Sequence, residues 1–347
     1  MALAYEIRDG HLLWVRNPFT GVTSYAVDLR AKSFAYTLRR RHSHTEPAPS
    51  AGLDPRLLRQ ALEDCPFCPG HEDRSPNEII RVAPAQIARW SGARALPNAS
   101  WVIRAFNNLF PRVPGELTAG RNESYVIVED PRHFLDEPRS LNDLLYTGAL
   151  GEEQFFAVMD VVARLTKRAL ENTAVGSVTV RKNQGPESGA SQPHVHQQVI
   201  GAPSVLPALE MELRAHREDP RLWEEMVELA SELELTIERV GEVVSYVNPA
   251  GTFPQSYDVI APRCFGLLSE LSQDELRSFA AVFYRLLAFL GPLPLDYEIH
   301  QGLGLPLHAH INVRVFPYSN VAGTLNIPRH LPEIAARIRR AVGTKHK

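Results

Sequence analysis

The sequence contains the same series of elements twice, and this repetition constrains the fold more than any other feature. Each copy has a β-branched strand ending in a Pro-Arg turn, then an amphipathic helix, a strand ending in glycine, and a strand with the pattern His-x-His. The paired segments are 125–133 and 257–264, 152–172 and 273–290, 179–185 and 297–302, and 193–200 and 307–313. Because four matched elements recur in one order, we infer an internal duplication of a strand–helix–strand–strand unit.

These elements predict an α+β protein of two similar halves, each with an antiparallel sheet flanked by a helix. We expect a first half over residues 1–207, a helical connection over 208–240, and a second half over 241–347. Ahead of the first copy, alternating residues over 11–36 predict a hairpin. Residues 39–56, basic and then rich in Pro and Ser, predict a loop.

Composition limits the classes of partner. The chain has 347 residues, 44% of them hydrophobic, and a formal net charge of −3. No overall basic field draws it to nucleic acid or to an anionic membrane surface. The sequence has neither a signal-peptide pattern at its start nor a run of about 18 apolar residues. We therefore expect a cytoplasmic protein with no nucleic-acid or membrane partner.

The three cysteines are too few for a disulfide framework in a chain of this length. Cys65 and Cys68 form a C-x-x-C pair, which is typical either of a redox pair or of half a metal site. The flanking residues Pro66 and Pro69 make a turn-rich knuckle. A redox pair is expected at a strand-to-helix junction, so this setting favours metal.

The first His-x-His strand concentrates side chains that suit phosphoryl chemistry. Alternate residues of a strand face the same way, so His194, His196 and Gln198 are predicted to share one face. The preceding loop, 183–192, is rich in small and polar residues, whose backbone amides can approach a phosphate closely. Such histidines can also be hydrogen-bonded core residues. Two matching strands, the C-x-x-C pair and His133 together favour a functional site.

These motifs resemble the histidine-triad superfamily and, within it, the galactose-1-phosphate uridylyltransferase family. The superfamily strand reads His-φ-His-φ-His-φ-φ, and the transferases have glutamine in the last histidine position, where this chain has Gln198. The family's Asn-Pro-x-Thr-Gly segment matches Asn17–Gly21, followed by Arg30. The resemblance runs from residue 17 to about residue 317 and implies an α+β fold of two histidine-triad-like repeats.

The resemblance implies two metal sites. In the family, zinc is bound by a C-x-x-C pair, a distant histidine and the first histidine of the His-x-His pattern. Some members bind a second metal, zinc or iron, through one glutamate and three histidines. The matching residues are Cys65, Cys68, His133 and His194 for the first site, and Glu212, His300, His308 and His310 for the second. Two thiolates and two imidazoles suit a structural tetrahedral zinc.

The resemblance also implies a ping-pong nucleotidyl transfer. His196 attacks the α-phosphorus of a nucleotide donor and a phosphate then attacks the nucleotidyl-imidazole, while the His194 carbonyl orients the nucleophile. Imidazole suits this role because it is nucleophilic near neutral pH and leaves phosphorus readily. The remaining residues that match family contacts to phosphate or nucleoside are Gln198, Ser191, Asn183, Asn107, Asn108 and Arg30.

Gln198 favours transfer over hydrolysis, because an amide, unlike a third histidine, does not protonate a leaving group. The chain departs from the family at Val195, where the family has proline, and at Ser33, where it has a second arginine. The family's hexose-contacting Lys-Phe…Gly-Tyr-Glu stretch is replaced over residues 318–328. We therefore expect altered sugar specificity.

The favoured function is transfer of a nucleoside monophosphate between a nucleoside diphosphate sugar and a sugar phosphate. One alternative is an adenylyl-transferring phosphorylase that cleaves ADP-sugars or dinucleoside polyphosphates. The other is a nucleotide-binding module without activity, against which the complete set His194, His196, Gln198 and Ser191 argues. Because family members often form dimers, the resemblance also implies a homodimer.

Overall fold

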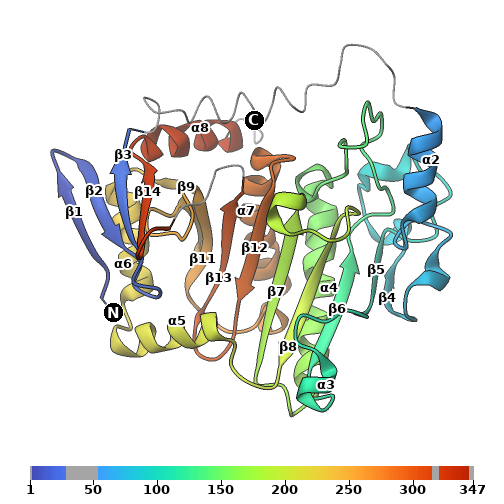
Figure 1. Ribbon diagram of the computed structural model, residues 1–347, viewed down its shortest axis with the longest axis horizontal. Coiled ribbons are helices and arrows are strands. Elements are labelled where there is room, and N and C mark those ends of the chain that lie inside the picture. Colours follow the sequence, from blue (N-terminus) through green and yellow to red (C-terminus); the bar gives the residue numbers. More distant parts are fainter. Residues whose placement is uncertain (1, 29–53, 315–319, 344–347) are drawn as a thin grey trace.

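The computed structural model describes residues 2–28, 54–314 and 320–343, and its centre is one ten-stranded antiparallel sheet (Figure 1). The strands, from one edge to the other, are β4 (Glu78–Val82), β5 (Ile103–Asn107), β6 (Glu123–Val128), β8 (His196–Ala202), β7 (Ser177–Gln184), β12 (Leu295–His300), β13 (Pro306–Val313), β11 (Ser256–Phe265), β10 (Val243–Val247) and β9 (Thr236–Val240). The predicted α+β class is confirmed. The two expected sheets are parts of one sheet, because β7 pairs with β12.

Both copies contain the predicted strand–helix–strand–strand series. In the first, β6 is followed by α4 (Glu152–Glu171), β7 and β8, and in the second, β11 is followed by α7 (Gln273–Leu290), β12 and β13. Ser272 caps α7 by accepting a hydrogen bond from the Glu275 N–H, at 3.3 Å, and this Ser-x-x-Glu sequence is typical of the start of a helix. The domain boundaries stay a prediction.

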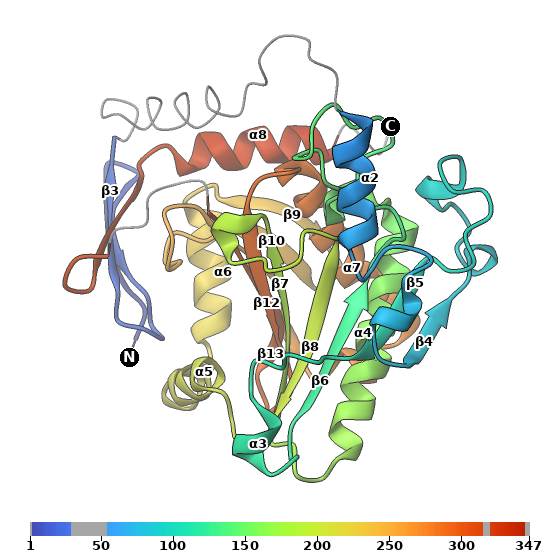
Figure 2. The same ribbon diagram turned by 45° about the vertical axis from the view of Figure 1, so that its right-hand side comes forward.

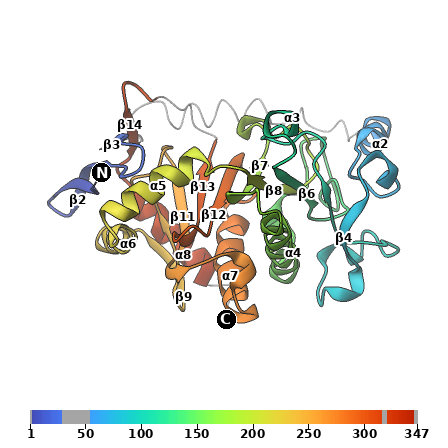
Figure 3. The ribbon, with the colours of Figure 1, turned by 90° about the horizontal axis from the view of Figure 1, so that it is seen from below.

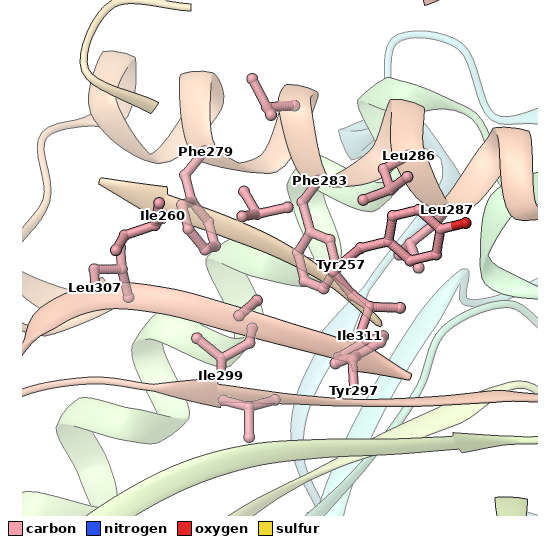
Figure 4. Packing of buried hydrophobic residues seen from close by; sticks show 14 of the residues in the cluster. Tyr257, Ile260, Phe279, Phe283, Leu286, Leu287, Tyr297, Ile299, Leu307 and Ile311 are labelled. Carbon is pink, nitrogen blue, oxygen red and sulfur yellow. The ribbon is translucent and has the colours of Figure 1, made fainter. Parts of the chain in front are cut away.

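The two long helices lie together on one face of the sheet, while α5 (Pro207–Glu218) lies on the other (Figure 3). Aromatic rings join the two halves, since Phe155 of α4 contacts Phe283 and Tyr284 of α7 at 5.6 and 5.8 Å between ring centroids. Figure 4 shows Phe279 and Phe283 of α7 packed over Ile299 and the neighbouring strands. This burial of apolar area holds the halves together as one body.

The predicted helical connection is partly wrong. It contains α5 and α6 (Leu222–Glu232), but its last part is the edge strand β9, which pairs with β10. The segment 236–240 has the sequence TIERV, with three β-branched residues, of which Ile237 is buried. Pairing with β10 satisfies its backbone polar groups, which outweighs the helical pattern before it.

A second, four-stranded sheet has the order β1 (Ala4–Arg8), β2 (His11–Arg16), β3 (Thr23–Val27) and β14 (Thr324–Pro328). The β2–β3 hairpin confirms the predicted one as far as residue 28, and β3 pairs in parallel with β14 from the far end of the chain. The helix α8 (Leu331–Gly343) follows β14 (Figure 2). No helix in the described ranges is long and apolar enough to cross a membrane.

The part of the sequence between β3 and β4 contains the predicted phosphate contact and the predicted loop. Arg30, Ser33 and most of the predicted loop 39–56 lie outside the described residues. The prediction of a loop is wrong for its last two residues, because α2 (Pro55–Asp64) begins there. The Asp54 side chain accepts a hydrogen bond from the Arg56 N–H at 2.8 Å, and proline suits the first helical turn.

The strand register aligns side chains in a row across the sheet. We call this the transverse row, and from β5 to β11 it consists of Phe106, Val126, Gln198, Arg181, Glu298, His310 and Asp258. Tyr297 and Ile311 face α7 (Figure 4), so their chain neighbours in the row face the opposite side of the sheet. His196, Gln198, His300 and His310 differ from these row residues by even numbers along their strands or belong to the row, so their side chains also lie on this face.

Candidate active site and metal centres

His196 is the first residue of β8 and lines a cavity of about 260 Å³ on the face of the sheet opposite α4 and α7. Ser191, Asn183 and Gln198 line the same cavity, so the structure brings four predicted residues together. The other lining residues are Phe110, Pro111, Arg112, Gly189 and Ala190. The loop between β7 and β8 curves around the cavity, with Gly185 and Gly189 in the left-handed region at φ of 81° and 84°.

The imidazole of His196 has a defined tautomer. Its Nδ1–H donates to the carbonyl oxygen of His194 at 2.8 Å, which leaves the lone pair on Nε2. Burial lowers the pKa of His196 to about 4, and the positive charge of Lys182 contributes to this. The ring is therefore neutral at pH 7, which is the state required of a nucleophile.

The two predicted asparagines differ in position. Asn108 Nδ2 donates to Gln198 Oε1 at 3.2 Å, which orients the Gln198 amide toward the cavity. Asn107 is exposed at the end of β5 and is not among the described residues that line the cavity. Successive residues of a strand point to opposite sides, so only one of the pair reaches the site.

Sequence reasoning missed a buried ion pair behind His196. Lys182 Nζ donates to Glu129 Oε1 and to the carbonyl oxygen of His196 itself, both at 2.8 Å. Thr147 Oγ1 donates to the other Glu129 oxygen at 2.7 Å. The one available signal is that Lys182 continues the buried positions Val178 and Val180 of β7, where an apolar residue is expected.

The sequence analysis also did not identify Phe110 as a residue of the cavity. Its side chain is 89% exposed although it lines the cavity of His196, and Leu109 beside it is also exposed. An exposed phenylalanine beside a polar cavity offers a flat face on which a base or sugar can stack. The residues before it, Asn107 and Asn108, carry the only sequence signal, which is their match to the family's nucleoside-contacting segment.

The first predicted metal set is assembled from three separate segments. Donor atoms of Cys65, Cys68, His133 and His194 all lie within 4.8 Å of one another, and the four residues are buried. Cys65 follows α2, His133 follows β6, and His194 precedes β8. The prediction that His194 lies within the strand is therefore wrong, because β8 begins only at His196 and the chain before it turns toward the cysteines.

The chemistry of this first cluster suits a metal. His194 Nε2–H donates to the Asp130 carbonyl oxygen at 2.7 Å, so the Nδ1 lone pair faces the Cys65 Sγ at 3.5 Å. Hydrogen bonding from Cys68 is the main cause of a lowered pKa of the Cys65 thiol. Thiolates and neutral imidazoles at these positions could hold a tetrahedral zinc ion.

The second set, Glu212, His300, His308 and His310, also has its donor atoms within 4.8 Å. His308 Nδ1–H donates to the Pro306 carbonyl oxygen at 2.7 Å, and its buried Nε2, 3.4 Å from Glu212 Oε2, has no hydrogen-bond donor among the described residues. A buried nitrogen with a lone pair and no donor nearby is costly unless a cation lies beside it. These residues could hold a metal that accepts oxygen and nitrogen ligands.

Other groups orient the histidines of the second set. His310 Nδ1–H donates to Asp258 Oδ1 at 2.8 Å, and His300 Nε2 lies 3.3 Å from Glu298 Oε2. Carboxylates in this position fix the ring orientation and the tautomer of a metal-binding histidine. Asp258 and Glu298 are members of the transverse row, so the second cluster lies on the same face of the sheet as His196.

Known proteins resemble this chain in sequence and in fold. The family described as "Domain of unknown function (DUF4921)" matches residues 112–293. An ADP-glucose phosphorylase of Arabidopsis thaliana is 25% identical over 166 residues, which cover 43% of this chain and 40% of that protein. The chain therefore matches less than half the length of this curated relative.

Two solved structures share the fold. The ADP-glucose phosphorylase of Arabidopsis thaliana with bound ADP-glucose has a TM-score of 0.66 at 18% identity, over 94% of this chain and 97% of that one. A uridylyltransferase has a TM-score of 0.61 at 20% identity, over 96% of this chain and 99% of that one. The fold expected from the resemblance to the uridylyltransferases is thereby confirmed.

Proposed function

This chain belongs to the family described as a domain of unknown function, DUF4921, and we propose that it is a nucleotidyltransferase with His196 as its nucleophile. The observation that carries the proposal is the tautomer of His196, whose Nδ1–H donates to the His194 carbonyl oxygen. Its Nε2 lone pair is therefore available within a polar cavity, beside the amides of Gln198 and Asn183.

The reaction has two displacements. His196 Nε2 attacks the α-phosphorus of a nucleotide donor, a phosphorus–nitrogen bond forms, and the phosphorus–oxygen bond to the leaving phosphate breaks. An oxygen of an incoming phosphate then attacks the same phosphorus, and the bond to Nε2 breaks. Both phosphates are ionised at neutral pH, so neither step requires a proton from Gln198.

Polar side chains around His196 position the phosphate. Gln198 and Ser191 donate to its non-bridging oxygens, where negative charge develops, and Asn183 contacts the phosphate from β7. Asn108 positions Gln198 through the hydrogen bond between their amides. Arg30 is proposed as a further phosphate contact and lies outside the described residues.

Metals have a structural role in this proposal. Zinc held by Cys65, Cys68, His133 and His194 would fix the segment that leads into the nucleophile. Zinc or iron held by Glu212, His300, His308 and His310 would fix β12 and β13 to α5. The His194 side chain would bind metal while its carbonyl orients His196.

We infer that the donor is a nucleoside diphosphate sugar and the acceptor a sugar phosphate. The similarity to an ADP-glucose phosphorylase supports a second candidate, in which an adenylyl group passes to inorganic phosphate. Both candidates share the same intermediate on His196 and differ in base and acceptor. The homodimer and the cytoplasmic location stay predictions.

Intact-protein mass spectrometry tests the proposal. We would incubate the protein with UDP-, ADP-, GDP- and dTDP-sugars and with dinucleoside polyphosphates. We expect a mass gain of one nucleoside monophosphate, and the adduct should be acid-labile. The donor that gives this gain identifies the base. His196→Ala should abolish the gain, and His11→Ala, a change at an exposed histidine of β2, should retain it. No adduct with any donor, in protein shown to contain metal, would reject the nucleophile.

A further inference from the structure

A second cavity of about 260 Å³ lies on the same face of the sheet as His196, over β7, β12 and β13. It is distinct from the cavity of His196 and shares no lining residue with it. Six of its lining residues are Arg181, Asp296, Glu298, Asn312, Arg314 and Phe253. Three further lining residues, Glu212, His300 and His310, belong to the second predicted metal set, so the cavity lies beside that set.

The strand order places this cavity directly beside the nucleophile. Gln198 of β8 is paired with Arg181 of β7, which is paired with Glu298 of β12. Adjacent strands are about 4.8 Å apart, so Glu298 lies roughly 10 Å from the strand of the nucleophile. Arg181 joins the two cavities, since its Nε donates to Oδ1 of Asn183 at 3.1 Å and its guanidinium pairs with Glu298.

The residues proposed for the nucleoside lie on the other side of β8. Asn108 and Phe110 follow β5, which is separated from β8 by β6. A donor with its α-phosphorus at His196 and its base beside Phe110 would therefore direct its leaving group across β7 toward β12. A sugar joined through two phosphates would reach the second cavity.

The wall of the second cavity is built to bind hydroxyl groups. Asp296 is only 3% exposed and holds its neighbours in place, accepting from Asn312 Nδ2 at 3.1 Å and from Arg314 Nε at 2.7 Å. The Arg181 and Arg314 side chains are each 25% exposed. Two guanidinium groups face the carboxylates of Asp296 and Glu298, and Asp258 and Glu212 add two further carboxylates to the lining, so the cavity carries no excess of positive charge that would attract another phosphate.

Such a wall suits a neutral polyol better than an additional phosphate. A hydroxyl group both donates and accepts, so it can use the adjacent guanidinium, amide and carboxylate groups together. Phe253 adds an apolar face, over which the Arg314 guanidinium lies at 3.7 Å from the ring centroid. Sugar rings combine hydroxyl edges with apolar C–H faces and match this combination of groups.

We propose that this cavity binds the sugar ring of the leaving sugar phosphate, and of the acceptor sugar phosphate in the second step. The inference rests on the proposed nucleotidyl transfer through His196. It assigns Arg314 and Asn312 as the residues that contact the sugar, Asp296 as the residue that positions both, and Arg181 as the bridge to the phosphate contact Asn183.

The test compares two donors that carry the same nucleoside monophosphate. One is the nucleoside diphosphate glucose that forms the His196 adduct, and the other is the nucleoside 5′-phosphorimidazolide, whose leaving group contains no sugar. The rate of adduct formation is measured by rapid quench and mass spectrometry. The variants are Arg314→Met and Asn312→Ala, because one of them can remain folded if the other does not.

We expect both variants to form the adduct from the sugar donor about tenfold more slowly or worse, since each loses a hydrogen bond to substrate. The rate from the imidazolide should stay within about twofold. Arg277→Met is the matched control, because Arg277 also lies over a phenylalanine, Phe156, at 4.0 Å, but on α7. It should leave both rates unchanged.

Three outcomes are informative. Equal slowing with both donors would overturn the sugar site, because the cavity would then act on the nucleophile or on the fold. Unchanged rates with both donors would also overturn it, because the sugar would bind elsewhere. No adduct from either donor in the unsubstituted protein would instead reject the proposed transfer through His196.

Discussion

At the scale of single residues, the ion pair behind His196 distinguishes the two copies of the repeat. Lys182 and Glu129 are buried on the helix side of the sheet, and Lys182 donates to the carbonyl oxygen of His196. In the second copy the strand register places Val259 and Tyr297 at the corresponding positions, and neither is charged. We infer that the pair serves the position of His196 rather than the stability of the repeat.

This inference predicts different effects for single and double substitutions. Lys182→Met leaves Glu129 buried without its cation, so we expect a loss of about 3–5 kcal/mol in the free energy of unfolding. Replacing both residues with Met should recover most of that loss, because an apolar pair fits an apolar core. Both variants should form the nucleotidyl adduct at least about tenfold more slowly, because His196 is held less firmly.

Chemical denaturation gives the free energies, and intact-mass kinetics give the adduct rate. The control is the Arg285–Glu238 pair between α7 and β9, at 2.6 Å, replaced in the same way. It should change stability without slowing the adduct. A double variant at Lys182 and Glu129 that recovers both stability and rate would show that the pair has no role in positioning His196.

At the scale of elements, the turn containing Cys65 and Cys68 connects α2 to segments far along the chain. His133 follows β6 and His194 precedes β8, and the buried cluster draws all three segments together. Without a metal, these buried donors would face one another with little to hold them. The local structure around the nucleophile is therefore expected to depend on this turn.

Cys68→Ser should remove one equivalent of metal and lower the melting temperature, because a metal that binds only the folded state stabilises it. Elemental analysis by mass spectrometry and a thermal melt measure the two effects. The control is Cys264→Ser, since Cys264 lies in β11 outside both clusters. A Cys68→Ser protein with full metal content would contradict the first metal site.

At the scale of the whole molecule, the two copies form one folding unit. They share the β7–β12 pairing, and the 3-10 turn Thr147–Ala149 of the first copy packs on α7 of the second. Gly148 lies in that turn, and a Cβ there would be 2.4 Å from the Leu287 carbonyl oxygen of α7. No side chain larger than hydrogen fits without moving the backbone of one copy against the other.

Gly148→Ala should therefore destabilise the entire protein by roughly 1–3 kcal/mol. Tryptophan fluorescence and circular dichroism should shift together in one transition, because Trp101 is buried next to β5 in the first half and Trp223 of α6 packs on His308 of the second copy. Gly343→Ala, in α8 with no atom within 4 Å of the added Cβ, should not lower the midpoint. Two separate transitions would show instead that the copies unfold independently.

Local patterns in the sequence were sufficient to predict most helices and strands and to name the candidate donor atoms of the site. The helices α4 and α7, the cap at Ser272 and the strands β7, β12 and β13 follow from periodicity and capping over a few residues. The His-x-His and C-x-x-C patterns are local in the same sense. Their chemistry is determined by residue type, so the candidate nucleophile and metal donors could be named from the sequence.

The tertiary structure decided which of these residues meet. Lys182 and Glu129 are 53 residues apart, and Arg181 and Glu298 are 117 apart, so no local pattern pairs them. The turn before β8 separates His194 from His196, and the β7–β12 pairing joins the two copies into one sheet. Periodicity records which side of an element is apolar, whereas the partners of a buried charge depend on strand order and register, which only the packed chain fixes.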